Sequence, residues 1–334
     1  MQTADLYRWF ASYEARRKSP CFEAWATGVA EDPEVLAMID ALPPRQRQPN
    51  LLFAAARFVG VEPGPFEEFR TAVVERWDEV SDITALRRTQ TNEVGRCATL
   101  LPALATIPGP ISLIEVGASA GLCLYPDRLA YRYGTGPILA PDTEDEPLLL
   151  DCDVDGPVPV PDALPEVVWR AGIDLNPLDV RDPDDVRWLE TLVWPEQQHR
   201  LARLRAAVEI ARADPPNLVA GDLVAALPQL VASASEGSTV VVFHSAVLNY
   251  VTPEVRSEFI ALVDALGCRW LSNEGPGVIE FSTATLPPSP DPTTGLFTVA
   301  LDGTPLAYAD PHGSSLHWFD HRHGPPPDES GRQR

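Results

Sequence analysis

The sequence is poor in cysteine, in basic residues and in long apolar runs. Its 5 cysteines are scattered and form no C-x-x-C pair, so neither a disulfide framework nor a zinc site is expected. Lysine and arginine number 26 against 48 acidic residues, a formal net charge of −22, which argues against a nucleic-acid partner. No apolar run approaches the roughly 20 residues of a membrane span, so no membrane association is expected.

The first residues also lack the apolar core of a secretory signal peptide, because Asp5, Arg8 and Glu14 interrupt it. Together with the unpaired cysteines, this predicts a cytoplasmic protein. The 334 residues suffice for an α/β domain and a smaller subdomain. A small molecule is the expected partner, and the sequence specifies no oligomeric state.

What the sequence does contain is a short apolar run, residues 111–116, that is followed by a cluster of small residues. Glu115 lies near the end of the run, and Gly117-Ala118-Ser119-Ala120-Gly121 follow. This pattern predicts a buried strand that turns sharply into a helix over residues 122–129. In an α/β sheet, ligands lie at such a turn, beyond the carboxyl end of the strand.

Several chemistries compete for this turn. A dinucleotide site requires Gly-x-Gly-x-x-Gly, but Ser119 and Leu122 stand where the second and third glycines belong, and no phosphate-loop lysine is present. Gly-x-Ser-x-Gly also matches the nucleophile elbow of serine hydrolases, with Asp310 and His312 or His317 as further triad members. The long helical stretch before the motif makes that interpretation the second choice. A turn that binds no ligand is a further alternative.

The residues before this turn, 1–108, are predicted to form a helical N-terminal subdomain. Its last helix is expected to run from Ser81 to Leu104, with Gln90 on the buried stripe and Asn92 and Glu93 beside it. A polar residue on a buried stripe needs a partner. Gln90, Asn92 and Glu93 are therefore predicted to bind the substrate, with the subdomain as a cap over an acceptor pocket.

After the turn, strands alternate with helices over residues 109–320. An insertion at 131–166 is predicted to form a small hairpin or loop, residues 296–309 a closing hairpin, and residues 321–334 a disordered tail. Alternation of this kind predicts a doubly wound, mostly parallel, seven-stranded α/β sheet. Aspartates at 151, 153 and 155 are spaced as in a calcium loop, but the prolines that follow exclude the required helix, so no metal is expected.

The acidic-x-Gly-x-Ser-x-Gly order and the order of elements resemble class I S-adenosylmethionine-dependent methyltransferases with a Rossmann-like sheet. The resemblance implies S-adenosylmethionine as cofactor, and it implies cofactor contacts at the strand ends, namely Glu115, Gly117, Ala118, Ser119, Gly121, Asp174, Asn176, Gly221 and Asp222. The acids after the second and third strands would contact the ribose and the adenine. It also implies that acceptor chemistry lies after the fourth and fifth strands, at His244 as base, Ser245, Tyr250 and Glu274.

Three segments more closely resemble a bacterial family of uncharacterised proteins, over nearly the whole chain. These segments are residues 115–122, 171–177 and 243–245. This resemblance supports the fold and implies no activity. The sequence therefore predicts a methyltransferase-like enzyme for a small molecule, with a serine hydrolase or a catalytically inactive ligand-binding or interaction domain as alternatives.

Overall fold

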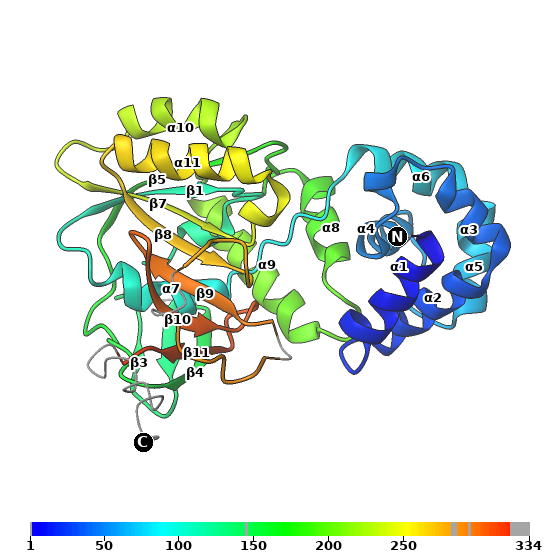
Figure 1. Ribbon diagram of the computed structural model, residues 1–334, viewed down its shortest axis with the longest axis horizontal. Coiled ribbons are helices and arrows are strands. Elements are labelled where there is room, and N and C mark those ends of the chain that lie inside the picture. The colour runs from blue at the N-terminus through cyan, green and yellow to red at the C-terminus, as the bar shows by residue number, and fades with distance from the viewer. Residues whose placement is uncertain (1, 144–145, 282–285, 293–294, 321–334) are drawn as a thin grey trace, which may run out of the picture. The chain divides into compact units, whose positions relative to one another are not determined.

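The computed structural model describes residues 2–143, 146–281, 286–292 and 295–320 (Figure 1). Contacts divide the chain into two compact units. The helical unit consists of Met1–Thr91 and Leu178–Arg205, and the α/β unit consists of Asn92–Pro177 and Ala206–Arg334. Residues 92–108, predicted to belong to the helical subdomain, thus belong to the α/β unit. The predicted disordered tail lies outside the described residues.

Prolines begin half of the helices that the structure describes in the helical unit. Ser19 and Asp32 are N-caps, and each is followed by a proline whose missing N–H needs no partner at that position. No helix in the described ranges is long and apolar enough to cross a membrane. The helices of this unit are α1 (Thr3–Trp9), η1 (Phe10–Ala15), α2 (Pro20–Glu31), α3 (Pro33–Asp40), η2 (Pro44–Gln46), α4 (Pro49–Phe58), α5 (Phe66–Glu75), α6 (Trp77–Leu86), α8 (Pro183–Leu192) and the first part of α9 (Gln198–Ala213).

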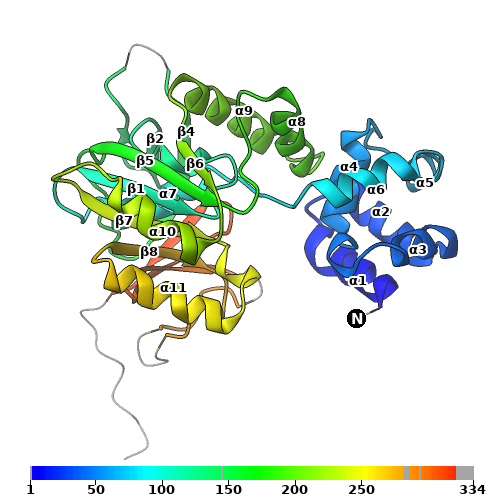
Figure 2. The same cartoon turned by 90° about the horizontal axis from the view of Figure 1, so that it is seen from above.

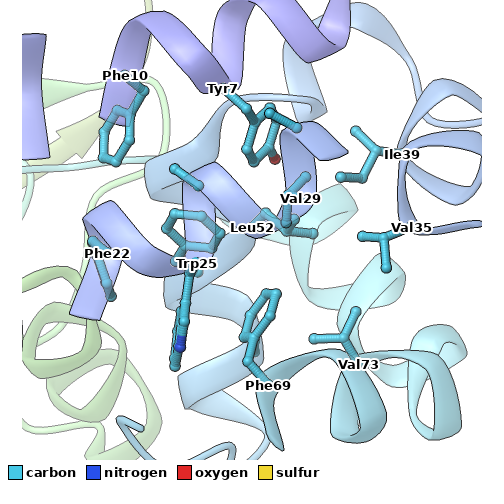
Figure 3. Close-up of a cluster of buried hydrophobic side chains, with 14 of the residues drawn as sticks. Tyr7, Phe10, Phe22, Trp25, Val29, Val35, Ile39, Leu52, Phe69 and Val73 are labelled. Carbon is cyan, nitrogen blue, oxygen red and sulfur yellow. The ribbon is translucent and has the colours of Figure 1, made fainter. Parts of the chain in front are cut away.

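Aromatic side chains fill the core of the helical unit (Figure 3). Trp25 stacks on Phe69 with ring centroids 4.2 Å apart, and its Nε1 donates a hydrogen bond to the Gly64 carbonyl. Trp194, which lies between α8 and α9, packs edge-on against Phe10 at 5.8 Å. This packing explains why residues 178–205 join the helical unit, although they lie between two strands in sequence.

The predicted long helix from Ser81 to Leu104 is wrong. The chain forms α6, leaves the helical conformation at Arg87 and begins a new helix, α7 (Arg96–Leu104), in the α/β unit. Gln90 lies between these helices and is half-buried in the helical unit, so it occupies no helix stripe. The apolar residues keep their helical spacing across the gap between α6 and α7, so the pattern does not reveal that the helix is interrupted there.

The α/β unit contains one mixed sheet of eleven strands in its described residues, in place of the seven predicted. The order is β3-β2-β4-β11-β10-β9-β8-β7-β1-β5-β6, and β8, β7, β1, β5 and β6 are parallel neighbours. The strands are β1 (Ile111–Val116), β2 (Ala130–Tyr133), β3 (Ile138–Leu139), β4 (Leu149–Asp155), β5 (Val167–Asp174), β6 (Asn217–Ala220), β7 (Thr239–Ser245), β8 (Arg269–Glu274), β9 (Phe297–Leu301), β10 (Thr304–Ala309) and β11 (Ser315–Trp318).

Two predictions about the segments beside β1 need correction. The expected helix over residues 122–129 is only a single turn, η3 (Leu122–Leu124), because Pro126 disfavours helical backbone at the residue before it. The expected insertion at 131–166 supplies β2, β3 and β4 to the main sheet. The closing hairpin is confirmed, since β9 and β10 pair antiparallel around Asp302 and Gly303, which both have positive φ.

The two faces of the parallel strands pack against different helices. α10 (Leu223–Ala232) and α11 (Pro253–Ala265) lie side by side on one face (Figures 1 and 2), where they cover Ile114, Val116 and Val242. α7 lies against the other face and contacts β8 and β9. It also contacts β4, although three strands separate β4 from β8 in the sheet. The sheet therefore curls around α7, and all residues of that helix are buried.

A proline inside α7 links the helix to the surrounding sheet by a hydrogen bond. Pro102 has no N–H, so the carbonyl of Ala98, one helical turn earlier, loses its usual partner. The hydroxyl of Tyr133, on β2, donates to that carbonyl at 2.7 Å. Tyr133 thus satisfies a buried acceptor that the helix cannot satisfy itself.

We predict that Tyr133→Phe destabilises the protein by about 1–3 kcal/mol, because the Ala98 carbonyl becomes a buried acceptor without a donor. Urea unfolding followed by circular dichroism measures the change. In a Pro102→Ala background the helix regains an N–H for this carbonyl, so Tyr133→Phe should then have a smaller effect. Equal losses in both backgrounds would contradict the assignment.

Candidate functional site

The candidate site lies at the carboxyl ends of the parallel strands, on the face that α7 covers. Ile114 and Val116 lie under α10 and α11, so Glu115 between them projects to the opposite face. Ser245 and Asn273 are paired across β7 and β8, and the Asn273 Nδ2 donates to the Ser245 Oγ at 3.0 Å. Side chains from three adjacent strand ends therefore share this face.

The predicted glycine turn is held closed by Asn92. Its Nδ2 donates to the Ala118 carbonyl at 2.8 Å, and its Oδ1 accepts from the Leu122 N–H at 2.8 Å. The structure thus makes Asn92 a brace of the turn, although the sequence predicted a substrate contact. Ser119 at the centre has φ +52°, in the left-handed region.

The structure brings Asp174 to this turn, as the sequence predicted. Its Oδ2 accepts from the Ser119 N–H and its Oδ1 from the Asn176 N–H, both at 2.8 Å. Gly221, after β6, donates its N–H to the Asp174 carbonyl at 2.9 Å. Asp222 is exposed, and its Oδ1 caps α10 by accepting from the Val224 N–H at 2.9 Å. Asp174 therefore lies at the turn, whereas the Asp222 carboxylate caps α10.

The glycines of the turn are explained by packing within the protein. A Cβ on Gly117 would lie 2.4 Å from a methyl of Val247, and one on Gly121 would lie 2.9 Å from Pro216. Both glycines also have positive φ. Sequence spacing cannot distinguish a glycine that admits a ligand from one that admits a neighbouring side chain.

The predicted base, His244, lies on the other face of the sheet. It is fully buried, and its ring contacts Phe259 of α11. The Trp270 Nε1–H donates to the His244 Nε2 at 2.9 Å, and the His244 Nδ1 is 2.7 Å from the Glu274 Oε1. Because tryptophan only donates, Nε2 is the acceptor and Nδ1 carries the proton. Neither ring nitrogen can then take a proton from a substrate, which corrects the assignment of His244 as base.

Glu274 is a brace on the same face, and this corrects its predicted contact with substrate. Its Oε1 also accepts the N–H groups of Val247 and Leu248, at 2.9 and 3.0 Å. Burial opposes ionisation, but the hydrogen bonds from His244 and from these N–H groups outweigh it and lower the pKa of Glu274. The ionised Glu274 therefore orders the loop that follows β7. That loop ends in η4 (Leu248–Tyr250), where Tyr250 is 74% exposed.

Glu115 is a buried acid with an unsatisfied oxygen. Its Oε2 has no hydrogen-bond partner among the residues that the structure describes. Burial, and then the nearby Cys123 and Asp174, raise the pKa of Glu115 well above its ordinary value, and Arg96 only partly opposes them. Burial thus disfavours the ionised form of Glu115 relative to an exposed glutamate.

Arg96, at the start of α7, is a site residue that the sequence analysis missed. It is 7% exposed, its Nε donates to the Pro311 carbonyl at 2.9 Å and its Nη1 to the Ser245 carbonyl at 3.0 Å. Its guanidinium also lies 5.7 Å from the centre of the Phe297 ring. The sequence feature that could have indicated Arg96 is its position as the one charged residue in a mostly apolar stretch, residues 96–104. We call Arg96, Glu115, Ser245 and Asn273 the polar cluster.

The loop between β10 and β11 borders the polar cluster. Glu93 is buried beside Arg96, accepts from the Gly95 N–H and lies 3.6 Å from the Nδ1 of His312. The Asp310 Oδ1 accepts the backbone N–H of His312. The Ser119 Oγ is buried without a partner in the described part of the chain. The triad of the hydrolase alternative is therefore not assembled.

The raised pKa of Glu115 has a measurable consequence. The pKa of this carboxyl group is higher in the folded protein than in the unfolded chain, so ionisation favours the unfolded chain. The contribution of Glu115 to stability therefore falls as the pH rises above 4.5. We predict that Glu115→Gln gains stability relative to the native protein between pH 5 and 8, by up to about 1.4 kcal/mol per pH unit. Urea unfolding at a series of pH values tests this, and parallel stability curves would contradict it.

Comparison with known proteins identifies the family but no activity. No curated protein and no solved structure matches the chain significantly. Within the described ranges, no group of three or more His, Cys, Asp and Glu residues is arranged to hold a metal ion. A family model matches residues 4–318, which confirms the resemblance inferred from the sequence. The chain therefore belongs to the family described as "Uncharacterized protein conserved in bacteria (DUF2332)".

Proposed function

We propose that the α/β unit binds S-adenosylmethionine and transfers its methyl group to a small-molecule acceptor. The parallel strands support this proposal. These strands lie in the sheet in the order β6-β5-β1-β7-β8. When they are numbered 1 to 5 along the sequence, this is the order 3-2-1-4-5, which is typical of a Rossmann-like sheet. After β1 the chain adds β5 and β6 on one side of β1, and it then adds β7 and β8 on the other side. The position between β1 and β7 is therefore a topological switch point. Ligands of such sheets bind at this point.

The observation that carries the proposal is the position of Asp174 at the turn. An acid at the end of β5, with its carboxylate against the Ser119 N–H of the turn, is placed where the two neighbouring hydroxyls of a ribose would lie. Leu175, the next residue, is 82% exposed, which provides an apolar surface for the flat face of a nucleobase. Asp222, after the next strand, offers its Oδ2 to an exocyclic amino group.

The residues present fit such a cofactor. The buried Oε2 of Glu115 and the buried Oγ of Ser119 are without partners among the described residues, and both lie near Asp174. Polar atoms of this kind are normally satisfied by water or by a ligand. Val247 covers the Gly117 Cα, so a nucleoside would lie along Ser119 and Asp174.

When bound, S-adenosylmethionine supplies a methyl group activated by its sulfonium. The contribution of the protein is then mainly to orient the two reactants. Ser245 ends β7 on the acceptor side of the switch point, and the exposed Tyr250 follows that strand. We assign these two groups to orient the acceptor. His244 takes no part, because both of its ring nitrogens have partners.

Calorimetric titration with S-adenosylhomocysteine tests the proposal. We expect Asp174→Asn to weaken binding by about tenfold or more, because the ribose loses a charged acceptor. The exposed Asp162→Asn is the control and should bind like the native protein. Absence of both heat and thermal stabilisation at about millimolar ligand, well above ordinary cofactor dissociation constants, would contradict the proposal.

A further inference from the structure

The polar cluster contains a buried cation without an anionic partner. In the part of the chain that the structure describes, no carboxylate lies within ion-pair distance of the Arg96 guanidinium. Its Nε and Nη1 donate to backbone carbonyls, and its Nη2 has no partner among those residues. Buried arginines are normally paired with a negative charge. The arrangement therefore favours an anion at Nη2.

Unsatisfied acceptors lie beside this cation. The Asn273 Oδ1 and the Glu115 Oε2 are buried and have no hydrogen-bond partner among the described residues. Strand register places both on the face that α7 covers, with Ser245 between them on β7. Native proteins leave few buried polar atoms unpaired, so two on one face call for a donor from outside the chain.

We infer that the polar cluster binds an α-amino-carboxylate group, with the carboxylate on Arg96 and the ammonium on Asn273 and Glu115. A carboxylate alone would leave the two acceptors unsatisfied. An ammonium alone would face the positive charge of Arg96. A phosphate would require more donors than a single guanidinium offers. Only a group with both charges, a short distance apart, complements the whole cluster.

This inference rests on the proposed function for one of its two possible ligands. S-adenosylmethionine itself ends in an α-amino-carboxylate, and Glu115 lies within electrostatic reach of both Asp174 and Arg96. A cofactor with its ribose at Asp174 would extend toward the cluster. The other ligand is a free amino acid, whose binding at the polar cluster does not depend on the proposed function.

Four compounds distinguish these ligands, the two nucleosides by calorimetry and the two smaller compounds by thermal unfolding. S-adenosylhomocysteine carries the α-amino-carboxylate, whereas methylthioadenosine has the same nucleoside and thioether without it. L-methionine represents the free amino acid, and 3-(methylthio)propylamine, which lacks the carboxylate, is its control. The variant is Arg96→Met, and the matched control is Arg256→Met, since Arg256 also donates to two backbone carbonyls but lies on α11.

If the cluster binds the cofactor, Arg96→Met should weaken S-adenosylhomocysteine by about tenfold or more and methylthioadenosine by less than about twofold. If it binds a free amino acid, L-methionine but not the amine should raise the thermal midpoint, and Arg96→Met should abolish that rise. Arg256→Met should change neither result. Should Arg96→Met not fold by circular dichroism, Asn273→Leu replaces it with the same expectation.

The inference is overturned if the folded variant binds both nucleosides and L-methionine as the native protein does. In that case binding of S-adenosylhomocysteine would still support the proposed function. If neither nucleoside binds but L-methionine stabilises the protein through Arg96, the proposed function fails and the α-amino-carboxylate site stands.

Discussion

Enclosure of α7 by the curled sheet is the constraint on which the site depends. The helix is buried on every side, and the Tyr133 hydroxyl satisfies the one carbonyl that Pro102 leaves open. Its first residue, Arg96, is thereby held against the carboxyl ends of the strands, where the backbone carbonyls of Ser245 and Pro311 accept from it. A cation can remain in such a place because the buried helix supporting it cannot move away.

The alternation of side chains along β7 and β8 separates structural from functional chemistry. His244 and Glu274 point toward α11, where they fix each other and the loop after β7. Ser245 and Asn273, the adjacent residues in sequence, point toward α7 and form part of the polar cluster. The same strand ends thus supply the His244–Glu274 hydrogen bond on one face and the polar cluster on the other.

Local patterns predicted part of this arrangement. The small residues at 117–121 mark the turn, and the apolar run before them gives β1, because both signals are local. The position of Asp174 beside Ser119 also followed, since parallel strands end at one edge of the sheet. Gly303 marked the hairpin between β9 and β10 for the same local reason.

The rest depended on contacts between residues far apart in sequence. Apolar spacing continued through Gln90, so it concealed the break that separates α6 from α7. The residue type made His244 a candidate base, and only the contact with Trp270 shows that its Nε2 lone pair is already used. The sequence does not indicate a role for Arg96, because its partners, Ser245 and Pro311, follow it by more than a hundred residues. In each case a tertiary contact overrode the local signal.

A crystal structure of the protein grown with S-adenosylhomocysteine tests the central claim most directly. The account places the ribose hydroxyls within hydrogen-bond distance of the Asp174 carboxylate and the nucleobase against Leu175, at the carboxyl ends of β1 and β5. Electron density for the nucleoside at another place on the α/β unit, with no nucleoside hydroxyl at hydrogen-bond distance from the Asp174 carboxylate, would contradict it.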